Sequence, residues 1–451
     1  MYDILMKPGF SAADAIPERH SSFLRSLSRY LPDTFTEPDR RITGMLLNIT
    51  QQCNMICTYC YAGGGSYGFS DEQANMSEDT AFQAIDLLIG LSRDAFRLNV
   101  TFFGGEPLMN FDLIPRVVSY AQKKAGEHGK KFTFSVVTNG TLLDEQICQY
   151  LTKNRILLVI SLDGDKEIND RTKKFGPSHY DIVMRNLQHF KDKRLLAVRA
   201  TLSKANYRHI NQIIDSFAAH GFPLVQFEEI SPATERQSLI FTDQDNPLLL
   251  QMYEEAYKRL VGDISVSDTK NIHPFMQEIF RIAFKRKDVH GCSAGRRNLA
   301  ISCQGEIYPC HRMVGDKNRA VGMVKEAFDW EMLEPYYRAD ITHKVPCKTC
   351  WARYLCSGGC VHAALIRNGD LLKPDELQCI RKKRLIELAA YHNRKLNKAK
   401  LFLCVPNILH SLRVSLGHLL KQQDWEYAEQ MEKNMGGFLM NQLLSRVSDI
   451  K

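Results

Sequence analysis

The stretch ITGMLLNITQQCNMICTYCY, residues 42–61, places an apolar run directly before three closely spaced cysteines. The apolar run at residues 43–50 predicts a β-strand. Cys53, Cys57 and Cys60 follow it in a C-x3-C-x2-C spacing. In parallel α/β sheets, ligands and reacting groups gather where the strands end. The stretch therefore predicts a loop with three thiols at the carboxyl end of the first strand.

The same pattern of strand followed by helix continues to about residue 230. Apolar, β-rich runs occur at 43–50, 97–104, 132–138, 156–163, 195–202 and 223–230. Amphipathic segments between them predict helices, for example 77–92, which begins at the cap-like Ser77, and 206–221, which ends at Gly221. Six such units predict a parallel sheet with crossover helices but are too few for a closed eight-fold barrel. The predicted fold class is α/β, a partial (β/α)6 TIM-like barrel followed by a cysteine-rich domain and a helical tail.

Shifts in pattern along the chain predict its domains. They are an N-terminal extension at 1–42, the barrel at 43–230, a helical linker at 231–290, a cysteine-rich domain at 291–380 and a helical tail at 381–451. The cysteine-rich domain has little periodic apolar pattern from which to build a core. We therefore expect bound metal to stabilise it.

Composition excludes several classes of function. The chain has 451 residues, 44% of them hydrophobic, which is enough for a substantial core. No apolar run approaches the length of a membrane span, and the N-terminus lacks a basic start followed by an apolar segment, so we expect a cytoplasmic protein without membrane association. The net charge of +8 is spread over the chain with both signs interleaved, so nucleic acid is not an expected partner.

The thirteen cysteines are the most informative part of the composition. Without an export signal they predict metal ligands rather than disulfides. Cys148 and Cys404 stand alone in helical or apolar stretches and are expected to be core residues. Three thiolates on one loop lack the fourth ligand of a closed zinc site, but they suit a cubane iron–sulfur cluster whose fourth iron stays open to a non-protein ligand. The alternative is a zinc site that takes a distant fourth cysteine.

CNMICTYCY at residues 53–61 resembles the C-x3-C-x-φ-C signature of radical S-adenosylmethionine (SAM) enzymes, in which φ is aromatic, here Tyr59. The resemblance implies that SAM chelates the open iron of a [4Fe-4S] cluster. One electron from the cluster then cleaves SAM to a 5′-deoxyadenosyl radical.

Further motifs follow at successive strand ends in the order expected for that family. GGEPL at 104–108 resembles the GGEP motif, which contacts the methionine amino group of SAM, and TNG, SLDG and VRATLS end later strands. Glycines let the backbone approach a ligand, while carboxylate and amide groups pair with its ammonium and hydroxyls. The resemblance implies cofactor contacts from Tyr59, Gly104, Gly105, Glu106, Pro107, Thr138, Asn139, Ser161, Asp163, Arg199 and Thr201.

The downstream cysteines resemble the seven-cysteine SPASM extension of radical SAM enzymes, which holds two auxiliary [4Fe-4S] clusters. The resemblance implies an outer cluster on Cys347, Cys350, Cys356 and Cys379, and an inner cluster on Cys292, Cys310 and Cys360. The inner cluster lacks one thiolate, because Asn298 occupies the place of an additional cysteine found in some relatives. Cys303 could substitute, but it lies where a turn residue is usual, and an open inner iron could instead bind a substrate thiolate. A zinc ribbon is the alternative for this segment.

SPASM enzymes mostly modify peptides or proteins, so we expect a maturase of a ribosomally made peptide. It would abstract hydrogen from a side chain or the backbone and form an intrapeptide thioether or carbon–carbon cross-link. A formylglycine-generating sulfatase maturase and a non-catalytic iron–sulfur electron carrier or scaffold stay open as alternatives. Sulfatase maturases carry an aspartate base directly after the cysteine of the YPC segment, where this chain has His311. His311 and Asp163 are the candidate catalytic bases, and a buried structural histidine is the other interpretation of His311.

The resemblance also implies partners. Residues 1–42 are too few for the winged-helix leader-binding module of many related enzymes, so we expect either a separate leader-binding protein or recognition by other means. The external one-electron donor would be of the flavodoxin or ferredoxin type. Arg296 and Arg297 could meet an acidic peptide or form a solvated turn, and the loop at Asn169–Gly176 resembles a family loop near the substrate.

Overall fold

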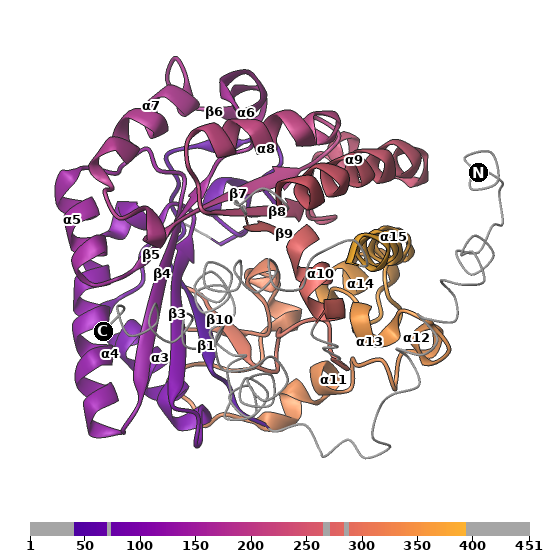
Figure 1. Ribbon diagram of the computed structural model, residues 1–451. Helices are drawn as coiled ribbons and strands as arrows, with labels where there is room; N and C mark the ends of the chain where they lie inside the picture. Colours follow the sequence, from indigo (N-terminus) through magenta and orange to yellow (C-terminus); the bar gives the residue numbers. More distant parts are fainter. Residues whose placement is uncertain (1–39, 70–73, 265–270, 284–287, 394–451) are drawn as a thin grey trace, which may run out of the picture.

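The computed structural model describes residues 40–69, 74–264, 271–283 and 288–393. Its main feature is a nine-stranded sheet with the strand order β11-β10-β1-β3-β4-β5-β7-β8-β9 (Figure 1). The six predicted strands form its centre, and every neighbouring pair among them is parallel. They are β1 (Gly44–Thr50), β3 (Arg97–Gly104), β4 (Lys131–Thr138), β5 (Leu157–Ser161), β7 (Leu196–Leu202) and β8 (Leu224–Glu229). The predicted fold class is confirmed.

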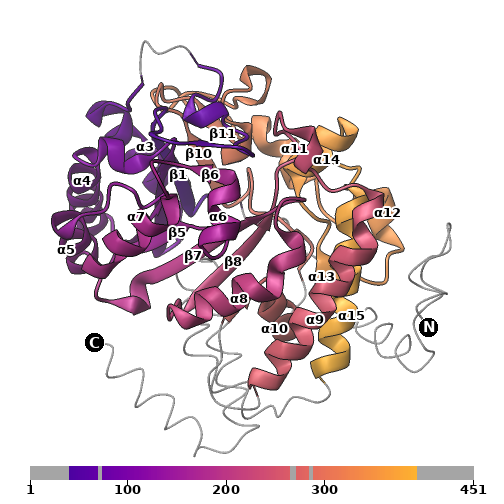
Figure 2. The ribbon, with the colours of Figure 1, turned by 90° about the horizontal axis from the view of Figure 1, so that it is seen from above.

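Crossover helices cover the outer face of this sheet, as Figures 1 and 2 show. Ser77 begins α3 as predicted, because its side chain accepts a hydrogen bond from the Thr80 N–H at 3.1 Å. Gly221 follows α8 with a φ of 69°, a left-handed conformation that favours glycine after a helix. The helices are α3 (Glu78–Leu91), α4 (Leu113–Glu127), α5 (Glu145–Lys153), α6 (Lys166–Thr172), α7 (His179–Asn186) and α8 (Ile210–Ala219).

Both edges of the sheet come from segments that the sequence places outside the barrel. β9 (Asn271–His273) pairs in parallel with β8, and β10 (Asn298–Ile301) pairs in parallel with β1. β11 (Ile307–Tyr308) then pairs antiparallel with β10. The segment 231–290 is therefore helical only in part, because β9 lies between its helices α9 (Asn246–Ile264) and α10 (Phe275–Ala283). These strands are too short to give a sequence pattern, and the unpaired edges of β1 and β8 select them.

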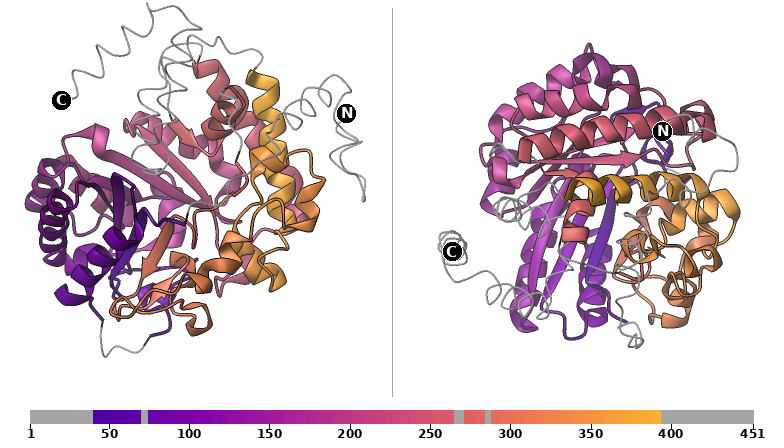
Figure 3. Two further views of the ribbon diagram at one scale, coloured as in Figure 1. Left: turned by 90° about the horizontal axis from the view of Figure 1, so that it is seen from below. Right: turned by 45° about the vertical axis from the view of Figure 1, so that its right-hand side comes forward.

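Short helices and irregular loops make up most of the cysteine-rich segment. α15 packs against α9 and α10 along one side of the molecule (Figure 3). The helices are α11 (Glu334–Tyr337), α12 (Val345–Lys348), α13 (Arg353–Cys356), α14 (Val361–Asn368) and α15 (Glu376–Asn393). The predicted helical tail is confirmed as far as Asn393; its remainder, with Cys404, and residues 1–39 lie outside the described residues.

The main apolar core lies between the sheet and the helices, whereas the other face of the sheet carries both polar side chains and a small apolar cluster of Leu157, Val159, Ala197 and Leu224. Thr101 and Ser135 share a hydrogen bond of 2.9 Å, and Asn99 donates to Thr133 Oγ1 at 3.2 Å. Cys148 of α5 is fully buried, as predicted. In the described part of the chain, every helix is too short or too polar to cross a bilayer.

Candidate active site

The three-cysteine loop leaves β1 and is held by a second, two-stranded sheet. β2 (Ile56–Cys57) pairs antiparallel with β6 (Lys173–Lys174), so Cys57 lies opposite Lys173. The thiols of the loop are close enough to affect one another. Burial raises the pKa of Cys53 to about 12, and Cys57 and Cys60 contribute to the rise. The Cys53 thiol therefore needs a metal to become a thiolate at neutral pH.

Gly104 and Gly105 lie directly against the backbone of the cysteine loop. A Cβ atom on Gly104 would lie 2.2 Å from Thr50 O, and one on Gly105 would lie 2.2 Å from Gln52 O. The Gly105 N–H donates to Thr50 O at 2.9 Å. The sequence predicts that these glycines let a ligand approach the backbone. In the structure, the glycine backbone instead lies against the protein's own cysteine loop and holds it at the end of β3.

Glu106 connects the ends of β3 and β4 beneath this loop. Its buried carboxylate accepts hydrogen bonds from Thr138 Oγ1 at 2.6 Å, Asn139 N at 2.7 Å and Leu108 N at 3.0 Å. Asn139 in turn donates to Asn54 Oδ1 at 2.8 Å, inside the loop. Burial raises the pKa of Glu106 to about 7, although the three hydrogen bonds lower it. The implied contact with the SAM amino group stays a prediction, and one acceptor position of the carboxylate remains for it.

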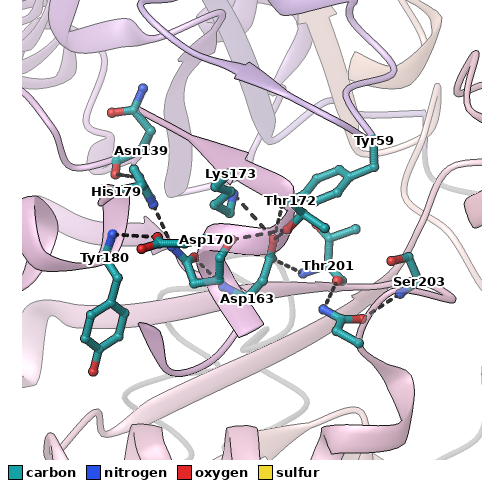
Figure 4. A network of polar contacts seen from close by, with 12 residues as sticks. Tyr59, Asn139, Asp163, Asp170, Thr172, Lys173, His179, Tyr180, Thr201 and Ser203 are labelled. Atoms are coloured by element: carbon teal, nitrogen blue, oxygen red, sulfur yellow. Dashed lines mark hydrogen bonds and ion pairs between the residues drawn. The ribbon is translucent and has the colours of Figure 1, made fainter. Parts of the chain in front are cut away.

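Asp163 and Tyr59 form the centre of a second polar network, shown in Figure 4. The Tyr59 hydroxyl donates to Asp163 Oδ2 at 2.6 Å, Thr172 Oγ1 to the same oxygen at 3.1 Å, and the Thr201 N–H to Oδ1 at 2.9 Å. Lys173 Nζ lies 3.9 Å from Asp163 Oδ2. Because Asp163 is fully buried and already has these partners, its geometry favours positioning Tyr59 and Lys173 over proton abstraction.

Lys173 belongs to the loop Asn169–Gly176, but nothing in the sequence distinguishes it from the other residues of that loop. Its ammonium lies 5.3 Å from the centre of the Tyr59 ring, with only 5% of the side chain exposed. Burial opposes its charge, but Asp163 and the three loop cysteines outweigh burial and raise its pKa. A buried ammonium requires negative charge nearby. A thiolate-held cluster with the carboxylate of an amino-acid cofactor would supply such charge, so these residues fit the implied groups.

His179 is a second residue that the pattern did not reveal. Its Nε2 lies 2.9 Å from Asn139 O and its Nδ1 lies 2.9 Å from Asn169 Nδ2. Burial, followed by the charge of Lys173, lowers its pKa to about 4. The neutral ring therefore connects α6 to the end of β4.

Two of the downstream cysteines have as neighbours other cysteines of the group that the SPASM resemblance implies for them. Burial, followed by Cys292 and Cys360, raises the pKa of Cys310 to about 12. In the other group, burial followed by Cys356 and Cys347, with Cys350 further down, raises the pKa of Cys379 to about 12. The structure thus brings each group together, and the ligand roles stay predictions.

Lys344 fits anionic clusters at these two groups. It is fully buried, and its Nζ donates to Gly358 O at 2.7 Å. Burial lowers its pKa, and the groups that oppose this effect are thiols of both cysteine groups. They are Cys347, Cys292, Cys356 and Cys360. Among the described residues, no three Cys, His, Asp or Glu side chains lie close enough together to hold a single metal ion.

Cys303 lies in the core rather than at an open metal site. Its Sγ donates to Asn48 O at 2.9 Å and its side chain is fully buried. Asn298, on β10, donates to Ser293 Oγ at 2.9 Å. This geometry favours the predicted structural role for Cys303 over a role as the fourth inner ligand.

His311 lies where the barrel interior meets the inner cysteine group. Its ring contacts those of Phe103, 5.3 Å away, and Tyr61, 6.2 Å away, and its Nδ1 is 3.8 Å from Cys310 Sγ. Burial lowers its pKa well below the usual range, and the cation of Arg312 adds to this effect. The ring is therefore neutral at neutral pH.

The other predicted cofactor residues occupy the expected strand ends. Pro107 is buried and begins the 3₁₀ helix η3 (Pro107–Asn110), and Ser161 pairs with Arg199 across β5 and β7. Arg199 faces the barrel interior, where its guanidinium lies 4.0 Å from Glu228 Oε2. Arg296 is half-buried and donates to Cys292 O at 3.3 Å, so it lies against the inner cysteine group rather than in a solvated turn.

Residues 47–216 match the family model described as the radical SAM superfamily. The chain contains a radical SAM domain. This enzyme is 26% identical over 371 residues to an uncharacterized protein of Archaeoglobus fulgidus, a match that covers 79% of the chain and 82% of the relative. It is 26% identical to the cysteine-type anaerobic sulfatase-maturating enzyme of Clostridium perfringens (strain 13), over 68% of the chain and 85% of the relative. It is 23% identical to the radical SAM cyclopropyl synthase TigE of Paramaledivibacter caminithermalis, over 76% and 73%.

Solved structures share the fold of the enzyme. The structure of anSMEcpe with bound AdoMet and Kp18Cys peptide superposes with a TM-score of 0.65 at 20% identity, covering 78% of this chain and 98% of that one. Streptococcus suis SuiB bound to its precursor peptide SuiA superposes with a TM-score of 0.52 at 16% identity, covering 80% and 79%. At these identities the likeness extends to the fold alone.

Proposed function

We propose that the enzyme abstracts hydrogen from a peptide substrate and forms an intrapeptide thioether or carbon–carbon cross-link. Relatives that share its fold bind peptides, among them SuiB with its precursor peptide. The observation that carries the proposal is the residue after Cys310, because the chain has His311 where sulfatase maturases are expected to have an aspartate base. When bound, SAM and the primary cluster supply the radical that takes the hydrogen atom, and an auxiliary cluster accepts an electron.

The chain's own residues prepare the site for this chemistry. Cys53, Cys57 and Cys60 would hold the primary cluster, and Lys173 would pair with the carboxylate of SAM. Glu106 fixes the strand ends, and Tyr59 is held by Asp163. This buried arrangement positions the reacting groups and excludes water.

His311 is the proposed proton acceptor. A thioether formed from a C–H and an S–H bond releases one hydrogen atom, one proton and one electron. The neutral imidazole, with its Nδ1 beside Cys310, is placed to take the thiol proton. A carboxylate as buried as Asp163 is less suited to this role, because its oxygens already have donors.

Formylglycine generation is the second candidate. It is favoured by the similarity to named sulfatase-maturating enzymes over 68% of the chain. To separate the two, the reconstituted enzyme would be incubated anaerobically with SAM and either the Kp18Cys peptide or short peptides encoded next to its gene. An aldehyde captured by a hydrazine reagent would support formylglycine; a loss of two hydrogens without an aldehyde, with a cross-link in fragmentation spectra, would support coupling.

The cofactor content is proposed as three [4Fe-4S] clusters, one for SAM and two auxiliary. The reconstituted enzyme should hold about 12 irons per chain, and a variant with Cys53, Cys57 and Cys60 all changed to alanine should release no 5′-deoxyadenosine. An iron content of about four would contradict the auxiliary clusters. We also propose cytoplasmic location, a flavodoxin or ferredoxin as electron donor, and a separate leader-binding protein.

A further inference from the structure

Arg312 lies between the inner cysteine group and the barrel interior. Its backbone N–H donates to Cys310 Sγ at 3.5 Å, and its guanidinium lies 3.5 Å from Glu228 Oε2. Only 13% of its side chain is exposed. The guanidinium acts electrostatically on Cys310 and Cys360 as well as on Glu228. A permanent cation thus faces two proposed ligands of the inner cluster.

One carboxylate, that of Glu228, lies near two guanidinium groups beside the inner cysteine group. Glu228 lies 4.0 Å from Arg199 as well as 3.5 Å from Arg312. Burial opposes ionisation of Glu228, but the two arginines outweigh it and hold its pKa below the ordinary range. Two guanidinium groups therefore lie near one carboxylate beside the inner cysteine group.

We propose that Arg312 and Glu228 set the reduction potential of the inner auxiliary cluster, Arg312 raising it and Glu228 lowering it. Reduction adds a negative charge to a cluster, and a fixed cation in a buried site stabilises that charge. Because two guanidinium groups face one carboxylate, the inner site is the better acceptor for the electron that substrate coupling releases. The inference rests on the proposed function, because it requires the inner cluster to form.

The comparison of three charge variants tests this positioning role. Arg312→Gln removes the cation, Arg312→Lys keeps it, and Glu228→Gln removes the opposing charge. Each reconstituted enzyme would be titrated potentiometrically without SAM or substrate, and the clusters would be followed by electron paramagnetic resonance. Iron content and the number of cluster signals would be measured on the same samples.

We expect Arg312→Gln to lower the inner potential by an amount equal to about a tenfold change in the reduced-to-oxidised ratio, which is about 59 mV for one electron. Glu228→Gln should shift it the opposite way, and Arg312→Lys should stay near the wild-type value. The outer cluster serves as the internal reference. If the Arg312→Gln enzyme loses the inner cluster, the Glu228→Gln enzyme tests the inference: a higher inner potential supports it, and a lower potential overturns it.

Unshifted potentials with all clusters present would overturn this inference and leave the proposed function intact. A shift of the same sign in both charge-removing variants, or equal shifts of both auxiliary clusters, would also overturn it. Absence of any auxiliary signal in the wild-type enzyme would instead refute the cofactor content of the proposed function, and the inference with it.

Discussion

Replacing Gly104 with alanine should displace the primary cluster loop without disturbing the auxiliary region. Gly104 has a φ of 134°, and the added Cβ would lie 2.2 Å from Thr50 O. The backbone conformation costs about 1–3 kcal/mol for a non-glycine residue, and the overlap costs about 1–3 kcal/mol more. Their sum, about 2–6 kcal/mol, is a large part of the stability of a typical domain. The loop should therefore move away from β3 rather than keep its place.

Gly126 offers a matched control for this substitution. It lies in α4, where an added Cβ has no neighbour within 4 Å, so alanine there should be neutral or stabilising by about 0.5–1 kcal/mol. Chemical unfolding of the metal-free proteins and iron content after reconstitution would measure both effects. Gly104→Ala should lower the unfolding midpoint and lose about four irons per chain, while Gly126→Ala keeps both. Wild-type stability and iron content in Gly104→Ala would refute the reasoning.

Three further predictions concern single side chains. Lys173→Met should weaken SAM binding at least about tenfold, which corresponds to about 1.4 kcal/mol, in a calorimetric titration. Substitution of the exposed neighbour, Lys174→Met, should have little effect. Equal effects of the two substitutions would contradict a role for the buried ammonium. His311→Phe keeps an aromatic ring against the neighbouring rings, so 5′-deoxyadenosine should still form. The yield of modified peptide, measured by mass spectrometry, should fall about 10²-fold or more. An unchanged yield would exclude His311 as the base. The Cys310→Ala enzyme should lose up to about four irons per chain, whereas the Cys303→Ala enzyme should lose none. Loss of iron from the Cys303→Ala enzyme would show that Cys303 is a cluster ligand.

The central strands could be predicted because each is a continuous apolar run long enough to stand out, as in β1 and β3. β9 and β10 could not, because a strand of three or four residues carries no pattern of its own. Their places are decided by the free edges of β8 and β1, which belong to distant parts of the chain. Tertiary contacts therefore determine that these two short segments are strands, which their local sequence does not show.

The candidate site shows the same division. The resemblance to SPASM enzymes implies the two downstream cysteine groups, and in the structure Cys310 and Cys379 each have cysteines of their own group as neighbours. Lys173 could not be distinguished from Lys174, since a two-residue strand has no alternation to show which side chain faces inward. Likewise, nothing near Asp163 in sequence reveals that Tyr59, more than a hundred positions earlier, donates to its carboxylate.

The pairing of β10 with β1 has a mechanical consequence. The first strand of the cysteine-rich segment is hydrogen-bonded along the strand that leads into the primary cysteine loop. A hinge between the two cysteine regions would have to break this pairing. The fold therefore fixes their separation, and we expect the proposed peptide substrate to span it by bending its own chain.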